Sequence, residues 1–393
     1  MSQEEADGSA VANHTAWEAM WPSAELPATD ERQRLEQLKA GLLTEGVRLS
    51  ESARAQLLAE TYGHLTDHEY PTTGGLTLDL GSAVAVNAPV DEWFCTESTF
   101  EVEVEDGRYV VVDGAGTVHA VVRNIPLPGY LDEVDASARL VRDTCFSHAD
   151  RVRLSPIVGC AYQCDYCDLP AERYTRREAE QLIAALEVAM ADRALPPRHV
   201  MISGGSPGPK HVDWFVATIL AVAAASPLPL DVMMAAIPNR VDVVDRLVDG
   251  GVAGFSINLE LFGEEAAHLH IRGKHRHARP GFDAFVERAV GRLGRDGSVR
   301  SLLVAGLEPP EVALAGITHI AELGADPVIS PFRPAERTSL ATQSPPSAAE
   351  VLDLLYAARE VVADSGVHLG PRCVPCQHNT LTFPWDARPA NAE

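Results

Sequence analysis

From Cys145 onward, short apolar runs alternate along the chain with longer stretches in which apolar residues recur every three or four positions. The short runs predict buried strands, and the longer stretches predict amphipathic helices. The predicted strands are Arg153–Val158, His199–Ser203, Leu230–Ile237, Gly254–Leu261, Arg300–Ala305 and Asp326–Ser330. The predicted helices lie near Arg177–Ala191, Val212–Ala225, Val241–Asp249, Gly281–Leu293, Pro310–Leu323 and Ala348–Asp364. These units predict an α/β fold with a buried parallel sheet, either doubly wound or a (βα)6 partial TIM-type barrel.

The first 145 residues show a different pattern. Residues 1–30 are polar and are interrupted by Pro22 and Pro27, which predicts a loose arm. Leucines then recur at helical spacing, and around residues 100–105 valine and glutamate alternate as in a half-buried strand, which predicts a small antiparallel meander within residues 80–125. We therefore expect an α+β module over residues 31–145, the barrel over 146–340, and a C-terminal helix and cysteine-bearing tail over 341–393.

Composition narrows the class of protein. The 393 residues include 32 Lys and Arg and 56 Asp and Glu, a formal net charge of −24, and 46% of them are hydrophobic. This hydrophobic content predicts a sizeable core, and the charge argues against a protein that coats nucleic acid, because its field would repel phosphate backbones. No apolar run reaches the roughly 18 residues that a membrane helix needs, and the acidic N-terminus does not have the pattern of a signal peptide. We expect a cytoplasmic protein that binds neither nucleic acid nor a membrane.

Three cysteines lie close together just after the first predicted strand of the barrel. Cys160, Cys164 and Cys167 are spaced four and then three residues apart on one short loop. In a reducing compartment, clustered cysteines more often bind metal or do chemistry than form a disulfide scaffold. Three thiolates on one loop can hold an iron–sulfur cube and leave its fourth iron open to a small chelating molecule. The residues also leave open a structural zinc site in which Cys164 and Cys167 pair with Cys373 and Cys376.

The loop resembles the signature of the radical S-adenosylmethionine (SAM) superfamily. In that signature the cysteines follow a CxxxCxxC spacing and an aromatic residue precedes the third, a position that Tyr166 occupies here. The resemblance implies a [4Fe–4S] cluster held by the three cysteines, with SAM chelating the unique iron. It also implies that one electron cleaves SAM to a 5′-deoxyadenosyl radical, which takes a hydrogen atom from a small-molecule substrate. Segments at the ends of the later predicted strands place the chain nearest to the biotin-synthase-like branch.

Further cofactor-binding positions are implied by the same resemblance. Gly204 and Gly205 resemble the GGEP segment of the family, whose backbone binds the SAM ammonium, although Ser206 stands in place of the common glutamate. Asn258 and Glu260 resemble an N-x-E strand whose side chains contact SAM. The period of a strand predicts that both side chains lie on one face.

A polar, histidine-rich loop is predicted over residues 268–277, after the fourth strand. In the branch that the chain resembles, an arginine near this position binds the SAM carboxylate. We choose Arg272 over Arg276 for this role. Glu308 and Arg333, at the ends of the last two strands, fall in segments that resemble the "GLE" and "PFRP" segments of biotin-synthase-like members.

A second cysteine pair, Cys373 and Cys376, lies past the last predicted helix. CxxC spacing brings two thiolates onto one metal in a tight turn. A second iron–sulfur cluster would need additional ligands, for which Cys145, Cys95 and His378 are the candidates and Cys145 the preferred one. The alternatives are structural zinc, or reduced thiols that cap the barrel.

The cluster implies an electron donor of the flavodoxin or ferredoxin type. Such donors are acidic, and a local basic set predicts a surface that receives one. The set consists of Arg151, Arg153, Arg173, Arg176 and Arg177. Two alternative functions stay open: sulfur insertion from an auxiliary cluster at the C-terminal cysteines, and a non-catalytic iron–sulfur or zinc scaffold. The C-terminal tail is expected to close the mouth of the barrel.

Overall fold

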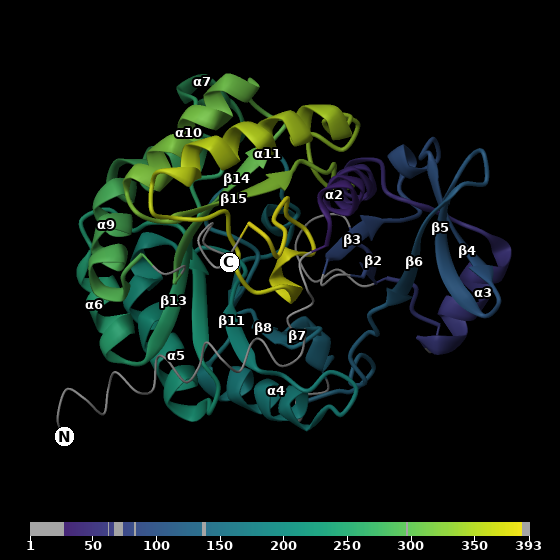
Figure 1. The fold of residues 1–393 in the computed structure, drawn as a ribbon. Coiled ribbons are helices and arrows are strands. Elements are labelled where there is room, and N and C mark those ends of the chain that lie inside the picture. The colour runs from purple at the N-terminus through teal and green to yellow at the C-terminus, as the bar shows by residue number, and fades with distance from the viewer. Residues whose placement is uncertain are drawn as a thin grey trace.

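The computed structural model describes residues 27–61, 63–66, 74–81, 84–135, 139–295 and 298–386, so that nearly all of the predicted N-terminal arm lies outside the described residues. Two large sheets organise the described residues, one of six strands and one of seven. Figure 1 shows the smaller sheet on one side of the molecule and the larger sheet, with helices packed around it, on the other.

The six-stranded sheet has the strand order β1-β4-β5-β6-β2-β3. Its strands are β1 (Arg48–Leu49), β2 (Gly75–Asp79), β3 (Ala85–Pro89), β4 (Phe100–Glu105), β5 (Arg108–Asp113) and β6 (Val118–Asn124). The helices α2 (Thr29–Thr44) and α3 (Glu51–Glu60) belong to the same part of the chain. The strands β4, β5 and β6 form the predicted antiparallel meander. The strand β2 lies outside the predicted range, because only Leu76 and Leu78 mark it as apolar.

The seven-stranded sheet has the strand order β15-β14-β13-β12-β11-β8-β7. Its strands are β7 (Cys145–His148), β8 (Arg151–Leu154), β11 (His199–Ile202), β12 (Leu230–Met234), β13 (Val252–Ile257), β14 (Val299–Ala305) and β15 (Asp326–Pro331). The helices that follow the strands are α4 (Ala179–Ala191), α5 (Val212–Ala225), α6 (Asp242–Asp249), α9 (Phe282–Leu293), α10 (Pro310–Glu322) and α11 (Ala348–Ala363). The parallel strands succeed one another in chain order without the reversal of a doubly wound sheet, which confirms the predicted (βα)6 partial barrel. The strand β7 was not predicted and pairs antiparallel with β8.

Three predicted boundaries differ from the structure. The first predicted strand breaks at Pro156, which has no N–H for the ladder, so β8 is followed by a separate strand β9 (Ile157–Val158) paired with β10 (Thr175–Arg176). The strand β13 ends at Ile257, before the predicted end. The predicted polar loop over residues 268–277 is instead helical. Its helices are α7 (Glu264–His270) and α8 (Arg272–His277). Elsewhere along the described chain, short 3₁₀ turns are η1 (Trp93–Cys95), η2 (Val141–Asp143), η3 (Leu169–Ala171), η4 (Pro209–His211), η5 (Arg279–Gly281) and η6 (Pro375–Gln377).

The C-terminal tail crosses the open side of the partial barrel. At one edge of the sheet, the Leu381 N–H donates to the carbonyl of Ile329 in β15 at 2.8 Å. At the other edge, the ring of His378 stacks on His148 of β7, with the ring centroids 3.7 Å apart. The Asn87 N–H of β3 donates to the His378 carbonyl at 2.6 Å. The tail therefore connects both edges of the barrel and the N-terminal sheet.

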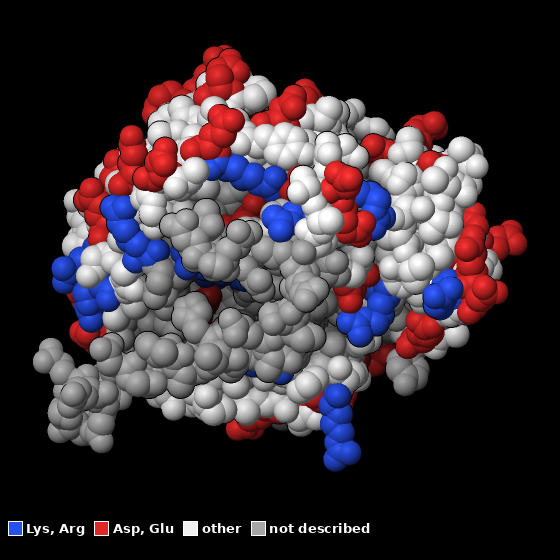
Figure 2. All heavy atoms as spheres, viewed as in Figure 1, with Lys and Arg blue, Asp and Glu red and all other residues white. Residues whose placement is uncertain are grey.

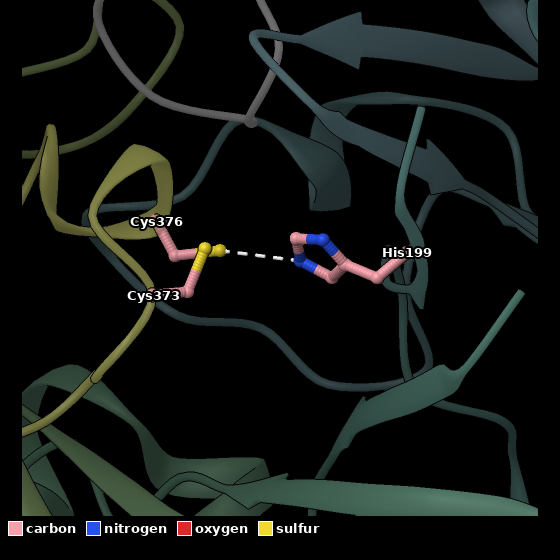
Figure 3. Close-up of side chains that lie close together, drawn as sticks. All are labelled: His199, Cys373 and Cys376. Atoms are coloured by element: carbon pink, nitrogen blue, oxygen red, sulfur yellow. Dashed lines mark hydrogen bonds between the residues drawn. The ribbon is translucent and has the colours of Figure 1, made fainter. Parts of the chain in front are cut away.

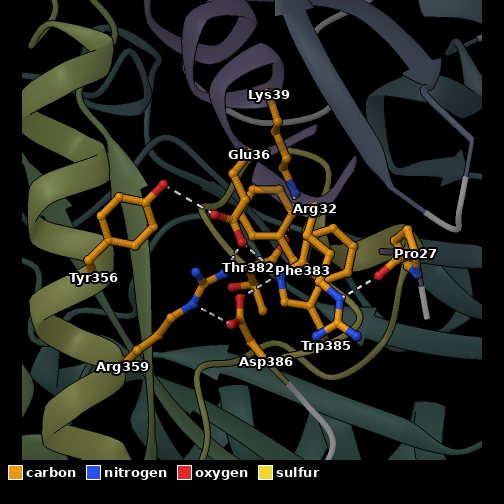
Figure 4. Close-up of polar contacts among 10 residues, drawn as sticks. All are labelled: Pro27, Arg32, Glu36, Lys39, Tyr356, Arg359, Thr382, Phe383, Trp385 and Asp386. Carbon is orange, nitrogen blue, oxygen red and sulfur yellow. Dashed lines mark hydrogen bonds and ion pairs between the residues drawn. The ribbon is translucent and has the colours of Figure 1, made fainter. Parts of the chain in front are cut away.

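A buried polar cluster fastens the tail between α2 and α11, as Figure 4 shows. Lys39 of α2 is fully buried, and its Nζ donates to two tail carbonyls at 2.9 and 2.7 Å. Glu36, also on α2, accepts from Arg359 of α11 at 2.7 Å and from the indole N–H of Trp385 at 2.8 Å. Asp386 accepts from the same arginine at 2.7 Å. These contacts join the N-terminal helix, the barrel and the tail into one packed unit.

Acidic side chains cover much of the rim of the face drawn in Figure 2, over the outer helices and over the N-terminal sheet. This distribution agrees with the net charge of −24. Arginine–aspartate pairs, such as Arg292 with Asp245 at 2.6 Å, link neighbouring outer helices. In the part of the chain that the structure describes, no helix combines the length and the apolar character needed to span a membrane.

Candidate functional site

A cavity of about 190 Å³ lies at the carboxyl ends of the barrel strands. The loop after β9, the ends of several strands and one residue of the tail contribute to its wall. Its lining includes Cys160, Cys164, Tyr166, Cys167, Gly204, Asn258, Glu260, Lys274, Arg333 and Asn379. The carboxyl ends of parallel strands meet at one edge of a barrel, which explains why residues so distant in the sequence share this cavity.

Glycines bring the cysteine loop against the end of β11. A Cβ on Gly205 would lie 1.7 Å from the carbonyl oxygen of Gly159, so a side chain here would displace the loop. Gly159 and Gly204 have φ of +69° and +129°, a region that L side chains rarely adopt. The expectation that these glycines allow close backbone approach agrees with this geometry, although the backbone they approach is that of the cysteine loop.

The three cysteines have the surroundings of metal-bound thiolates. Burial raises the pKa of Cys164 well above its usual value and raises the pKa of Cys167 to about 12. The Sγ of Cys160 accepts hydrogen bonds from the backbone N–H of Tyr162 at 3.4 Å and of Ser206 at 3.3 Å. Thiols whose pKa is raised in this way carry negative charge only beside a cation, and N–H donors to sulfur tune the reduction potential of iron–sulfur clusters. The donor set therefore fits an iron–sulfur cluster.

Glu260 and Lys274 form an ion pair in the cavity wall. Lys274 Nζ lies 2.6 Å from Glu260 Oε1, and their side chains are only 10% and 15% exposed, respectively. Glu260 has φ of +71°, which is unfavourable for a residue with a side chain and turns the chain away from β13. Its second oxygen, Oε2, is buried and accepts no hydrogen bond within the described residues. This orphaned acceptor fits a ligand that brings a donor, such as the amino or ribose hydroxyl group of SAM.

Asn258 and Tyr166 lie beside this ion pair. The Ser256 hydroxyl donates to Asn258 Oδ1 at 2.8 Å and thereby orients the amide. Burial raises the pKa of Tyr166 well above its usual value, and the nearby Glu260 carboxylate raises it further, so the phenol stays protonated. Asn258 and Glu260 thus share one cavity, although the strand that was expected to align them ends at Ile257.

Lys274, and not Arg272, lines the cavity. Arg272 is exposed at the start of α8 and does not line the cavity. Reading residues 268–277 as a loop concealed this, because Ile271, Lys274 and Ala278 have the spacing of one helix face and all three are buried. A helical interpretation of the segment would have pointed to Lys274.

The two other strand-end residues have different positions. Glu308 accepts from the backbone N–H of Gly263 at 2.8 Å and therefore holds the start of α7 rather than lining the cavity. Arg333 lines the cavity and donates to the carbonyl oxygen of Asn87 in β3 at 3.1 Å. Burial lowers the pKa of Arg333 to about 10, which leaves it charged near neutral pH.

A second, smaller cavity of about 40 Å³ adjoins the first. Arg333 and Asn379 line both cavities. The remaining wall comes from the N-terminal sheet, from β7 and from the tail, and includes Asn87, His148 and His378. The N-terminal module and the tail therefore extend the site beyond the barrel.

The C-terminal cysteines lie at the opposite end of β11. Cys373 and Cys376 lie within 4.8 Å of His199, the first residue of β11, as Figure 3 shows. His199 was not among the candidates proposed from the sequence. The preferred candidate, Cys145, instead donates from Sγ to the carbonyl of Ala185 at 3.3 Å. The zinc site that would pair these cysteines with Cys164 and Cys167 is not formed among the described residues, because the two pairs lie at opposite ends of the barrel.

The predicted basic docking surface is only partly present. Arg151 and Arg153 are 2% and 9% exposed, so they cannot contact a partner protein. They lie in β8, inside the sheet; Arg153 was expected to begin this strand, whereas Arg151 was not expected to lie in it. Arg173 and Arg176 are exposed near the cysteine loop.

Comparisons with known proteins agree with the cysteine loop. The family model of the radical SAM superfamily matches residues 154–325, and no curated protein matches the chain. Among solved structures, the FeFe-hydrogenase maturase HydG from Carboxydothermus hydrogenoformans has 15% identity and a TM-score of 0.46, covering 58% of this chain and 55% of that one. Coproporphyrinogen III oxidase (HemN) from Escherichia coli has 17% identity and a TM-score of 0.34, covering 43% of this chain and 41% of that one.

Methylornithine synthase (PylB) has 14% identity and a TM-score of 0.39, with 62% of this chain and 77% of that one covered. The chain spans little more than half the length of the hydrogenase maturases that it matches. These comparisons do not distinguish the biotin-synthase-like branch from others. Together with the cysteine loop at the carboxyl end of a partial barrel, the family match identifies residues 154–325 of the chain as a radical SAM domain.

Proposed function

We propose that Cys160, Cys164 and Cys167 hold a [4Fe–4S] cluster, that SAM binds in the adjoining cavity, and that the enzyme abstracts hydrogen from a small-molecule substrate. When bound, the cluster and SAM supply a 5′-deoxyadenosyl radical. The observation that carries this proposal is the shared cavity, which brings the three thiols together with Gly204 and the largely buried carboxylate of Glu260.

Residues of the cavity wall have distinct roles in this proposal. Glu260 Oε2, which accepts no hydrogen bond within the described residues, accepts from the amino or ribose group of SAM. Lys274 holds the Glu260 carboxylate in place through its 2.6 Å contact. The oriented amide of Asn258 provides a second polar contact. Met233 and Leu302 line the same cavity and exclude water, which protects a reactive radical from side reactions.

The substrate is proposed to lie towards the smaller cavity. Arg333 and Asn379 stand where the two cavities meet, so a substrate there would be next to bound SAM. The buried positive charge of Arg333 favours a substrate with an anionic or strongly polar group. The N-terminal module would then form part of the substrate wall.

Sulfur insertion from an auxiliary cluster is not favoured by the geometry. Cys373 and Cys376 do not line the cofactor cavity, and they lie beside the first residue of β11, whereas Ser203 and Gly204 at its far end line the cavity. A sulfide donor needs to reach the substrate radical. Flavodoxin or ferredoxin is proposed as the electron donor, with Arg173 and Arg176 as its exposed contacts.

Anaerobic reconstitution of the full chain tests the proposed function. Wild-type protein is expected to bind about four irons per chain and, after reduction, to release 5′-deoxyadenosine from SAM. Cys164→Ala should lose both properties, whereas Cys95→Ala, which changes a buried cysteine outside the cavity, should keep them. Iron and 5′-deoxyadenosine that persist in Cys164→Ala would contradict the proposal, and so would iron-loaded wild-type protein that leaves SAM intact and thus behaves as a non-catalytic scaffold.

A further inference from the structure

One histidine and two cysteines meet at the amino end of β11, away from the cofactor cavity. The ligand atoms of His199, Cys373 and Cys376 all lie within 4.8 Å of one another. Figure 3 shows the two sulfurs side by side, facing the imidazole. The Cys376 N–H donates to the Cys373 carbonyl at 3.0 Å, which closes the CxxC turn and directs both sulfurs to one side. His199 is presented by a central strand of the sheet and is only 3% exposed.

The spacing of these atoms is that of ligands on one tetrahedral ion. Zinc binds sulfur at about 2.3 Å and imidazole nitrogen at about 2.0 Å, so two such ligands on one tetrahedral zinc lie about 3.5 Å apart. Cys376 Sγ and His199 Nε2 are 3.4 Å apart. A [4Fe–4S] cluster binds each cysteine at a different iron, which spreads its ligands around the cluster. The distances therefore favour a single tetrahedral ion over a second [4Fe–4S] cluster.

Asp150 is the candidate for a fourth ligand, although its carboxylate oxygens do not lie within 4.8 Å of all three of these ligand atoms, so its side chain would have to turn towards the ion. Its side chain is only 1% exposed, and its Oδ1 has no hydrogen-bond partner within the described residues. Its carboxylate interacts electrostatically with His199, Cys373 and Cys376, and its carbonyl accepts from the His199 N–H at 3.4 Å. A buried carboxylate oxygen without a partner is costly, and a cation beside it removes that cost. Carboxylate oxygen is an ordinary zinc ligand.

Buried arginines balance the remaining charge. Two thiolates, one carboxylate and one zinc ion together carry a single net negative charge. Arg151 and Arg300 both interact electrostatically with Cys376. Arg300 also lies 2.9 Å from Asp231, which fixes its position inside the barrel. The three ligands are thus largely buried and their negative charge is compensated by nearby arginines, as expected for a structural zinc site.

We propose that His199, Cys373 and Cys376 bind one structural zinc ion, with the Asp150 carboxylate as the fourth ligand once its side chain turns towards the ion. The ion fixes the tail to the first residue of β11. Asn379 follows Cys376 by three residues and lines the cofactor cavity, so the zinc site also positions part of the cavity wall. This site is separate from the three cysteines assigned to the iron cluster.

Metal analysis of the full chain tests the zinc site, with zinc supplied in reducing buffer. Wild-type protein is expected to hold about one zinc per chain, and the double variant Cys373→Ser, Cys376→Ser at least about tenfold less. Cys145→Ser, which changes a buried cysteine outside the site, is the matched control and should retain zinc. Cys164→Ala should lose iron and retain zinc, which separates this proposal from the proposed function. Three outcomes would overturn the zinc proposal. They are wild-type protein without zinc, a double variant that keeps its zinc, and a double variant that loses iron but not zinc.

X-ray absorption at the zinc edge tests the same site without any substitution. The wild-type spectrum is expected to show two sulfur ligands at about 2.3 Å and two nitrogen or oxygen ligands at about 2.0 Å. A zinc environment of nitrogen and oxygen alone would mean adventitious binding and overturn the proposal. A disulfide between Cys373 and Cys376 in reduced, zinc-supplied protein would overturn it as well.

Discussion

Gly205 is the residue at which the fold depends most directly on the lack of a side chain. A Cβ there would meet the Gly159 carbonyl oxygen at 1.7 Å and the Cys160 Cα at 2.9 Å. Gly205→Ala is therefore expected to displace the cysteine loop and to lower iron binding from about four to fewer than about one per chain after anaerobic reconstitution. Gly208→Ala is the control, because its Cβ would meet only Ala161 at 3.7 Å. Normal iron content in Gly205→Ala would show that the loop tolerates the displacement.

The orphaned oxygen of Glu260 leads to a prediction about SAM affinity. Glu260→Gln keeps the shape of the side chain but removes the charge that pairs with Lys274. A charge-assisted hydrogen bond is worth about 1.5–3 kcal/mol, so SAM binding should weaken by about 10–100-fold while iron content stays unchanged. Equilibrium dialysis of the reconstituted protein with SAM measures this. Glu265→Gln, an exposed change on α7, should bind SAM as the wild type does, and equal affinities for Glu260→Gln and wild type would remove Glu260 from the SAM site.

Site residues could be predicted from the sequence where they lie close together along the chain, because their spacing then fixes their relative positions. Cys160, Cys164 and Cys167 share one loop, and Asn258 and Glu260 stay on one side despite the early end of β13. Other residues depend on how distant segments pack. His199 meets cysteines that lie more than 170 positions later. Nothing local to His199 in the sequence indicates where the tail will run.

At the scale of single elements, buried Lys39 of α2 makes the free energy of unfolding depend on pH. Burial lowers the pKa of Lys39 to about 7, and the nearby Asp386 carboxylate opposes part of this shift. A lysine in an unfolded chain has a pKa of about 10.4. Folding therefore releases a proton between these two values, and the contribution of Lys39 to stability rises with pH from about 7 to about 10. Below about pH 7 both states are protonated, and the cost of burying the charge is constant.

Thermal unfolding of Lys39→Met and wild type at several pH values checks this expectation. The melting temperature of the wild type minus that of Lys39→Met should increase from pH 7 to pH 10. The corresponding difference in the free energy of unfolding should increase by no more than about 1.4 kcal/mol per pH unit. Lys210→Met, which changes an exposed lysine, should show a constant difference from the wild type. A difference for Lys39→Met that is independent of pH would mean that Lys39 has an ordinary pKa in the folded protein.

Elements with a strong apolar period could be predicted well, and short or polar elements could not. The six parallel strands and the outer helices follow from periodicity because each buries a regular face. The helices α7 and α8 are rich in histidine and arginine, so their composition concealed a helical period that only Ile271, Lys274 and Ala278 reveal. The edge strand β7 was missed because pairing with β8, and not local composition, makes it a strand.

At the scale of the whole molecule, the C-terminal tail connects the two edges of the barrel with the N-terminal sheet. It pairs with β15 through Leu381, stacks on β7 through His378 and accepts a hydrogen bond from Asn87 of β3. The residues expected to form the α+β module and the C-terminal tail share buried contacts with each other and with the barrel. This arrangement rests on pairings between residues far apart in the sequence, which periodicity cannot indicate.

These shared contacts predict that the tail, β7 and β3 open together. Hydrogen exchange is slowest where backbone N–H groups are bonded and buried, and cooperative units lose protection as one. Peptides covering residues 373–383 should therefore exchange at least about tenfold more slowly than the exposed segment around residues 336–344. His148→Ala removes the stack on His378 and should speed exchange in the tail and in β3 as well as in β7. His64→Ala, which changes a partly exposed histidine of the N-terminal module, should leave the tail unchanged. Faster exchange in β7 alone would show that the tail does not couple the edges of the barrel, and the cavity wall at Asn379 would then need another support.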